Sequence, residues 1–264
     1  MLYRIVSHVP HILFKPVYDL YERYLLEKVK NGRIPNHVAI IMDGNRRWAK
    51  KLEKPPWYGH FFGSQKLEEI LEWCRELEIR TLTVYAFSTE NFRRSEEEVN
   101  ALMNLFEQKF KELVHDERIH RYGVKVNVLG RKDMLPENVR EAIKAAERAT
   151  ANYSDFTLNI ALAYGGRSEI VDAVREIVNE VLSGKLKPED IDEELIKQYL
   201  YYPNMPDPDI VIRTGGEERI SNFLLYQIAY SELFFVDVYF PEFRKIDFLR
   251  IIREYQRRQR RFGR

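Results

Sequence analysis

The sequence of 264 residues contains a single cysteine, Cys74, and no uninterrupted apolar run of membrane-spanning length. One cysteine cannot form a disulfide within the chain. Because Cys74 lies in an apolar helical pattern, we expect a buried structural thiol. The nearest approach to a span, residues 223–240, is interrupted by polar and charged side chains and lacks the ~18 continuous apolar residues of a membrane helix. We therefore expect a cytoplasmic protein.

An excess of one charge sign is also lacking. The chain has 42 basic and 41 acidic residues, a net charge of +1. A surface without a positive excess argues against nucleic acid as a partner, so any cationic chemistry must be local. The phosphate-loop pattern G-x-x-x-x-G-K-[ST], the dinucleotide pattern G-x-G-x-x-G, the zinc patterns H-E-x-x-H and C-x-x-C, and the hydrolase pattern G-x-S-x-G are absent too, which disfavours those enzyme classes.

Six short runs rich in strand-forming residues alternate with helical patterns. Most are nearly continuous in apolar residues, which is typical of strands covered on both faces. This alternation predicts a single α/β domain with a central, mostly parallel six-stranded sheet flanked by helices. The expected strands are residues 38–42, 81–87, 124–130, 156–164, 209–215 and 233–240.

Helix signals separate these runs. We expect a helix over residues 64–79, a second from Ser95 to about His120 with a Ser95–Glu98 capping box, and a third from Pro136. Ser168 and Gly184 bound a fourth helix.

Residues 16–30 form an amphipathic helix ahead of the first strand. Either it packs on the domain, or it lies on a membrane surface or lines an apolar opening. Its apolar stripe comprises Val17, Leu20, Tyr21, Tyr24, Leu25 and Val29.

The loop after the first strand reads Asp43-Gly44-Asn45-Arg46-Arg47. Ligands of open parallel sheets bind beyond the carboxyl ends of strands, and arginines clamp phosphate oxygens. A carboxylate beside an anion makes sense if Mg²⁺ lies between them. The alternative is an ordinary Asp-Gly turn with surface arginines.

Other strand ends carry similar side chains. Ser88, Asn91, Phe92 and Arg94 follow the second strand, and Gly165-Gly166-Arg167 follow the fourth. The fifth strand is followed by the densest group, in which we expect Ser221 to begin a helix: Arg213, Thr214, Gly215, Gly216, Arg219 and Ser221. We infer two phosphorylated ligands, or one ligand with two phosphate groups.

Four segments together resemble the cis-prenyltransferases, the family of undecaprenyl and dehydrodolichyl diphosphate synthases: "HVAIIMDGNRRWAKK", "YAFSTENFRR", "LNIALAYGGRSEI" and "DIVIRTGGEERISNFLLYQIAYSELFF". The resemblance runs from about residue 35 to the carboxyl-terminal "RRFG", so we divide the chain into an amino-terminal extension, residues 1–34, and a catalytic domain, residues 35–264.

The resemblance implies an enzyme that adds isopentenyl diphosphate, with cis geometry, to farnesyl or geranylgeranyl diphosphate. The long product would serve as a glycosyl-carrier lipid. It assigns Asp43 and Asn91 to catalysis and Asp43 and Glu232 to Mg²⁺. The allylic diphosphate would be bound by Gly44, Asn45, Arg46, Arg47, Trp48, His60, Ser88, Phe92 and Arg94. Isopentenyl diphosphate would be bound by Arg213, Arg219, Ser221, Arg261 and Gly263, the last two reaching a partner subunit in a homodimer.

Two positions depart from the family pattern. Pro56 stands where many members have an arginine, for which Lys54 or Arg46 would substitute, and Glu218 stands where a histidine is common. No D-D-x-x-D motif is present, which argues against the trans-prenyltransferases. Packing is the more ordinary role for Trp48.

Two further functions stay open. A non-catalytic isoprenoid-binding subunit would be expected to lose the Asp-Gly-Asn loop, and a phosphate-ester hydrolase would need a base poised near water. The elongating product needs an apolar tunnel, for which the candidates are Ile70, Leu102, Met103, Leu105 and Phe106, although ordinary core packing accounts for most such residues. A membrane-facing helix would suit release of an apolar product, so peripheral contact with the inner membrane face is a further expectation.

Overall fold

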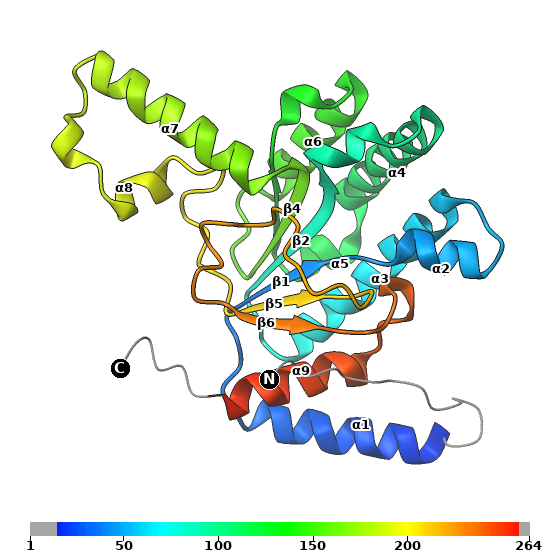
Figure 1. The fold of residues 1–264 in the computed structure, drawn as a ribbon. Helices are drawn as coiled ribbons and strands as arrows, with labels where there is room; N and C mark the ends of the chain where they lie inside the picture. The colour runs from blue at the N-terminus through cyan, green and yellow to red at the C-terminus, as the bar shows by residue number, and fades with distance from the viewer. Residues whose placement is uncertain (1–14, 259–264) are drawn as a thin grey trace.

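The computed structural model describes residues 15–258, which form a six-stranded sheet with helices on both faces (Figure 1). Every strand pairing is parallel, in the order β3-β4-β2-β1-β5-β6. This confirms the predicted α/β fold. The strands are β1 His37–Ile41, β2 Thr81–Ser88, β3 Val124–Leu129, β4 Phe156–Tyr164, β5 Ile210–Arg213 and β6 Glu232–Phe235.

The described helices cover the sheet and its β6 edge, where α1 and α9 lie side by side (Figure 1). Their bounds are α1 Lys15–Lys30, α2 Asn45–Lys51, α3 Pro56–Glu76, α4 Glu96–His115, α5 Glu117–Arg121, α6 Glu137–Thr150, α7 Gly166–Leu182, α8 Glu193–Gln198 and α9 Lys245–Arg257. Short 3-10 turns lie at Thr89–Arg93, Lys132–Met134, Pro188–Asp190 and Phe240–Glu242. None of these helices is both long enough and apolar enough to cross a membrane.

The strands bury side chains on both faces. In β1, Val38 and Ile40 join the larger core, which includes residues of α3, α4, α6 and α9, whereas Ala39 and Ile41 join a smaller core on the other face. Successive strand residues point to opposite faces, so two covered faces require a continuous apolar run. Cys74 is fully buried in the larger core, as expected for a structural thiol.

Helix α3 begins at Pro56, earlier than the expected start at Ser64. Gly59 and Gly63 look like helix breakers in the sequence, but here they allow α2 to pack closely on α3. A β-carbon on Gly59 would lie 2.1 Å from the backbone oxygen of Asn45. Tertiary packing therefore overrides the low helix propensity of these glycines.

Two other boundaries differ from prediction. The expected single helix from Ser95 is split at Asp116, whose side chain accepts a hydrogen bond from Arg118 N and starts α5. The helix expected at Ser221 is wrong. Ser221 and Asn222 have φ angles of 48° and 63°, in the left-handed region, and are followed by turns.

Helix α1 is confirmed, and it packs on α9 rather than standing apart from the domain. Leu25 and Val29 are fully buried in the larger core. Not all of the predicted stripe is buried, because the side chains of Val17, Leu20 and Tyr24 are more than half exposed. The packed half supports a structural role, and the exposed half leaves a surface open to contact.

Candidate active site

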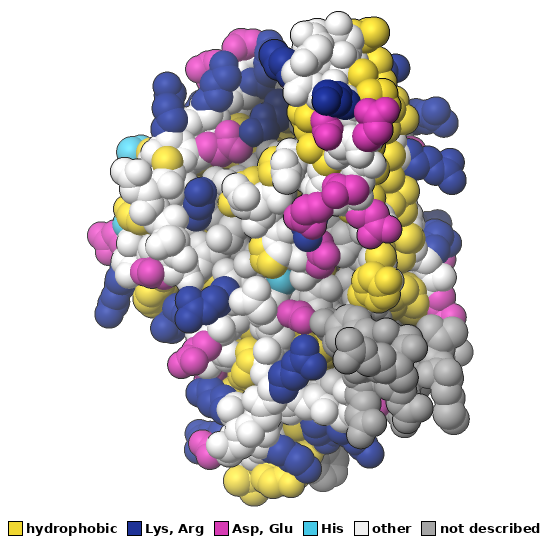
Figure 2. All heavy atoms as spheres, turned by 90° about the vertical axis from the view of Figure 1, so that its left-hand side faces the viewer, with side chains coloured by type: hydrophobic (Ala, Val, Ile, Leu, Met, Phe, Trp, Pro, Cys, Tyr) yellow, Lys and Arg dark blue, Asp and Glu magenta, His cyan; other side chains and the backbone are white. Residues whose placement is uncertain are grey.

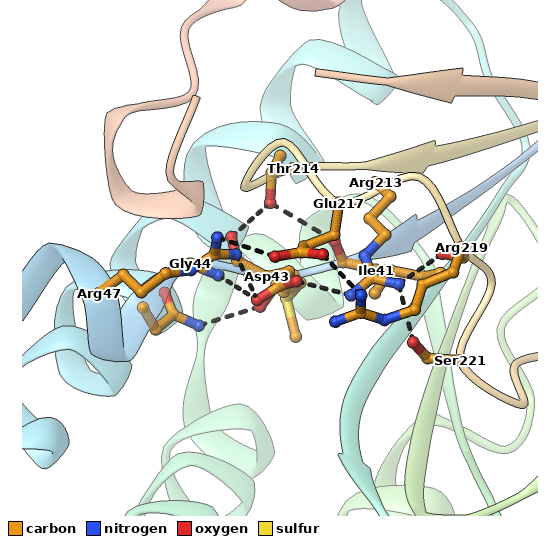
Figure 3. Close-up of polar contacts among 11 residues, drawn as sticks. Ile41, Asp43, Gly44, Arg47, Arg213, Thr214, Glu217, Arg219 and Ser221 are labelled. Carbon is orange, nitrogen blue, oxygen red and sulfur yellow. Dashed lines mark hydrogen bonds and ion pairs between the residues drawn. The ribbon is translucent and has the colours of Figure 1, made fainter. Parts of the chain in front are cut away.

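The loops after β1 and β5 meet at the carboxyl edge of the sheet (Figure 3). Asp43 lies between two guanidinium groups. Its Oδ2 accepts a hydrogen bond of 2.7 Å from Arg213, and its Oδ1 lies 3.2 Å from Arg47 Nη2. Thr214 Oγ1 donates to the Asp43 carbonyl at 2.7 Å, so both loops are joined through backbone as well as charge.

The environment keeps Asp43 ionised. Burial alone would raise the pKa of this carboxyl, but the hydrogen bond and charge of Arg213, together with Arg47 and the Gly44 N–H, lower it below its ordinary value. Gly215 makes the close approach possible. Its φ is 86°, and a β-carbon there would lie 2.6 Å from Arg47 Nη2.

A second carboxylate connects the cations of these loops. Glu217 accepts hydrogen bonds from Arg47 at 3.3 Å and from Arg219 at 2.6 Å. Arg213 is 4% exposed and also donates to Ser221 Oγ at 2.7 Å. The predicted fifth-loop residues are therefore in contact with the predicted first-loop residues.

A separate cluster of charged residues surrounds Glu98, whose side chain is 5% exposed. Its Oε1 accepts a hydrogen bond of 2.9 Å from Arg94 and lies 3.4 Å from Arg46 Nε and 3.6 Å from His60 Nε2. Burial lowers the pKa of His60 more than Glu98 raises it, so His60 is neutral near pH 7. Both candidates to replace the arginine absent at Pro56 are exposed, but only Arg46 contacts Glu98 of this cluster.

Several buried polar atoms at this edge have no hydrogen-bond partner among the described residues. They are Asn45 Oδ1, His60 Nε2 and Arg213 Nε. Unpaired buried atoms also occur elsewhere, as at Arg140 and Gln227, but these three lie together around one cavity, where a polar ligand could satisfy them. Asn91 is oriented by its own loop, because its Oδ1 accepts a hydrogen bond of 3.0 Å from Ser88 N and its amide nitrogen remains as the donor.

These residues line the mouth of a cavity of about 960 Å³, which lies between α3, α4 and the sheet. The polar residues at its mouth include Asp43, Asn45, His60, Ser88, Asn91, Arg94, Arg213, Arg219 and Ser221. Its body is lined by apolar side chains, among them the predicted tunnel residues Leu102, Leu105 and Phe106. Ile70 and Met103 do not line it and belong to the buried core. The volume is at the upper end of the roughly 300–1,000 Å³ typical of small-molecule pockets.

Glu232 is not brought to Asp43 within one chain, and its assignment to Mg²⁺ stays a prediction. It begins β6 and pairs in register with Ile210, so it lies at the amino edge of the sheet, where it forms an ion pair with Arg258. The carboxylate that follows β6 at the carboxyl edge is Asp237. A β-carbon on Gly216 would lie 2.7 Å from its Oδ1.

Two aromatic candidates pack rather than face the cavity. Trp48 stacks on Tyr58 at 5.9 Å between centroids, and Phe92 contacts the Phe87 ring edge-on at 4.8 Å. Glu218 is exposed, and no described contact gives it a role. Arg261 and Gly263 lie outside the described residues.

Sequence reasoning missed two carboxylates of this site. Glu98 carried only the signal of a Ser95–Glu98 capping box. Glu98 N donates a hydrogen bond to Ser95 Oγ as expected, but the Glu98 side chain contacts Arg94 instead of the Ser95 backbone, so only half of the capping box forms. The position of Glu98 four residues after Arg94 was the available clue to an ion pair. Glu217 carried no signal beyond its place among arginines, because its partner Arg47 is 170 residues away.

Comparison with known proteins agrees with this geometry. The model of the undecaprenyl diphosphate synthase family matches residues 41–263. The tritrans,polycis-undecaprenyl-diphosphate synthases (geranylgeranyl-diphosphate specific) of Thermococcus kodakarensis and Pyrococcus furiosus are 86% and 77% identical to the chain, each over the full length of both sequences. The crystal structure of lavandulyl diphosphate synthase from Lavandula x intermedia, in complex with dimethylallyl diphosphate, matches with a TM-score of 0.82 and 38% identity, covering 90% of this chain and 100% of that one.

Proposed function

The chain belongs to the undecaprenyl diphosphate synthase family, and we propose that it extends geranylgeranyl diphosphate by successive cis additions of isopentenyl diphosphate. The choice of geranylgeranyl over farnesyl diphosphate is supported by the specificity in the names of the relatives at 86% and 77% identity. The long polyprenyl diphosphate would then serve as the precursor of a glycosyl-carrier lipid.

The observation that carries this proposal is the composition of the cavity. Its mouth holds arginines, buried unpaired polar atoms and an ionised carboxylate, and its body is apolar. A substrate with a diphosphate head and a growing hydrocarbon chain matches both parts.

The cations at the mouth suit the condensation of the two diphosphates. The π electrons of isopentenyl diphosphate form the new C–C bond, while the allylic C–O bond breaks and its electron pair leaves with the diphosphate. A proton is then lost to that diphosphate or to water. Guanidinium groups directed at the leaving diphosphate stabilise the transition state more than the ground state. We assign isopentenyl diphosphate to Arg213, Arg219 and Ser221.

We assign the allylic diphosphate to the opposite side of the mouth. The residues that would bind it are Gly44, Asn45, Arg46, Arg47, His60, Ser88 and Arg94, with Asn91 near the reacting carbons. Glu98 would act as a positioning residue, because it touches Arg94 and approaches Arg46 and His60.

Asp43 fits Mg²⁺, which takes one or two carboxylates together with phosphate oxygens and does not need a cage of protein ligands. Among the described residues, no group of three or more histidine, cysteine or acidic side chains could hold a metal by itself. Asp43 would hold the ion against the diphosphate, and the ion when bound would neutralise charge on the leaving group.

The test is an assay of purified protein with Mg²⁺, geranylgeranyl diphosphate and labelled isopentenyl diphosphate, with extraction and sizing of the product. We expect label in a long polyprenyl diphosphate, and less of it with farnesyl diphosphate as primer. A phosphate-ester hydrolase would release phosphate without joining carbons, and a non-catalytic subunit would do neither. The non-catalytic subunit is disfavoured because Asp43, Asn45 and Arg47 are all present at one edge of the sheet.

We also propose a homodimer that forms through α7. This helix lies on the face of Figure 2, where hydrophobic side chains gather in a band. Val171, Val174 and Val178 are each nearly half exposed, and Leu182 is 80% exposed. Such a stripe suits a second copy of the same helix. Light scattering should show a dimer that Val174→Glu with Val178→Glu converts to monomer, and a wild-type monomer would exclude this interface.

A further inference from the structure

Asn222 follows Ser221 in the turn after β5. Among the described residues, Ser221 lines the cavity and Asn222 does not. The φ angle of Asn222 is 63°, in the left-handed region, which asparagine tolerates better than most residues. A residue keeps such a conformation when its surroundings fix it, so the contacts of Asn222 show what this turn is fixed to.

One set of these contacts caps helix α7 from a remote part of the chain. The residue before this helix is Gly165, which has no side chain to accept hydrogen bonds from the first N–H groups. Instead, the Asn222 carbonyl accepts a hydrogen bond of 2.7 Å from Gly166 N, and Asn222 Oδ1 accepts one of 2.9 Å from Arg167 N. Because the side-chain oxygen faces an N–H group, the amide nitrogen points the other way.

The amide nitrogen of Asn222 reaches the loop after β2. Its Nδ2 donates a hydrogen bond of 3.0 Å to Glu90 Oε1, although the two residues are 132 positions apart in the sequence. Burial alone would raise the pKa of Glu90, but hydrogen bonds from its own loop and from Asn222 lower it below its ordinary value. The acceptor is therefore an ionised carboxylate.

This hydrogen bond links the two sides of the mouth. On one side, Asn222 is next to Ser221, whose Oγ accepts a hydrogen bond from Arg213 (Figure 3). On the other side, Glu90 is next to Asn91, which we place near the reacting carbons. The pair thus connects the loop assigned to isopentenyl diphosphate with the loop that carries Asn91.

We propose that Asn222 and Glu90 are positioning residues, which hold isopentenyl diphosphate at reacting distance from the allylic carbon. This inference rests on the proposed function and adds two residues to it. A misplacement of about 1 Å can slow a reaction on the order of 10²-fold. A partly exposed hydrogen bond contributes only modestly to stability, so the pair affects the reaction much more than the fold.

The test is Asn222→Asp, which removes the donor to Glu90 and keeps the oxygen that caps α7. Two carboxylates would then face each other and repel. In a single turnover, we expect the rate of the first addition to fall about tenfold and KM for isopentenyl diphosphate to rise about fivefold. The melting temperature should change little, because the cap is retained.

The allylic substrate provides an internal comparison. Its KM should stay within about twofold of wild type, because the arginines assigned to it contact Asp43 and Glu98 rather than Asn222. A merely structural role would lower the melting temperature without this difference between the two substrates.

The double variant Asn222→Asp with Glu90→Gln reverses the hydrogen bond, because the new amide can donate to the new carboxylate. It should recover a rate within about threefold of wild type. The matched control is Asn138→Asp, since Asn138 Nδ2 donates to Glu107 Oε2 at 2.5 Å between α6 and α4. Neither of these is among the described residues that line the cavity, so the control should keep wild-type kinetics.

Wild-type rate and KM in a folded Asn222→Asp variant would overturn the inference, as would a double variant no faster than the single one. If Asn222→Asp does not fold, Glu90→Ala removes the acceptor at an exposed side chain and should raise KM for isopentenyl diphosphate. An unchanged KM in that variant would also overturn the inference. A wild-type protein that makes no polyprenyl diphosphate would instead overturn the proposed function.

Discussion

The two edges of the sheet use the same kinds of side chain for opposite purposes. At the carboxyl edge, Asp43 and Arg213 contact each other but stand beside buried polar atoms that lack partners. At the amino edge, His37 is fully buried, and both of its ring nitrogens have hydrogen-bond partners. The polar groups around Asp43 are therefore open to a ligand, whereas His37 is fully engaged within the fold.

The strongest test of this difference is Asp43→Asn against Asp155→Asn, the same change at opposite edges. Loss of the carboxylate at Asp43 should lower kcat/KM on the order of 10²–10³-fold, because Asp43 is the proposed holder of the Mg²⁺ that would neutralise charge on the leaving diphosphate. Asp155→Asn should leave the rate of the first addition within about twofold. Equal rates for the two variants in steady-state assays would remove the catalytic role of Asp43.

At the amino edge, we expect pH-dependent stability from His37. Its Nδ1 lies 2.6 Å from the Pro206 carbonyl, which can only accept, so Nε2 is unprotonated and accepts from Thr83. Burial lowers the pKa of His37 to about 4. The stabilisation is therefore complete above the unfolded pKa near 6.5 and decreases as pH falls toward 4, by about 3 kcal/mol in the free energy of unfolding.

Urea unfolding at several pH values between 4.5 and 7.5 measures this slope. His37→Gln should flatten it, and His115→Gln, at an exposed histidine, should not. A wild-type slope that survives His37→Gln would assign the effect to other groups.

A smaller effect is expected from Gly59→Ala at the carboxyl edge. The new methyl group would collide with the Asn45 backbone and push α2 away from α3, at a cost of about 1–3 kcal/mol in unfolding free energy. Activity should fall along with the melting temperature, because Asn45 is displaced from the mouth. Ser64→Ala on the same helix adds no bulk and serves as the control; equal melting temperatures for the two variants would contradict the close approach.

The smallest expected effect concerns membrane contact through α1. We expect Leu20→Glu to reduce cosedimentation with anionic lipid vesicles severalfold, since Leu20 is 70% exposed beside Val17 and Tyr24. The comparison is Ile191→Glu, which introduces the same charge at another exposed apolar residue, outside α1 and outside the α7 stripe. Equal retention of both variants on the vesicles would argue against α1 as the contact surface.

Prediction from sequence succeeded where the signal was local. The apolar runs identified all six strands, and the loops after the first, second and fifth strands supplied the residues that meet at the mouth. It failed where the signal was non-local. The place of Glu232 at the amino edge follows from strand register, and the ion pairs of Glu98 cannot be read from its helix-capping pattern.

The sequence alone determined the parallel sheet and the side chains delivered to its carboxyl edge, because strand periodicity and the direction of parallel strands are local properties. Only the tertiary structure decided that Asp43 contacts Arg213. It also decided that Glu98 lies within ion-pair distance of Arg46, Arg94 and His60. The ion pairs of Glu68, which link α3 to α4 and α5, are a third example. These contacts depend on the distances between elements remote in the chain. The packing of helices on the sheet determines such distances, and no short stretch of residues encodes them.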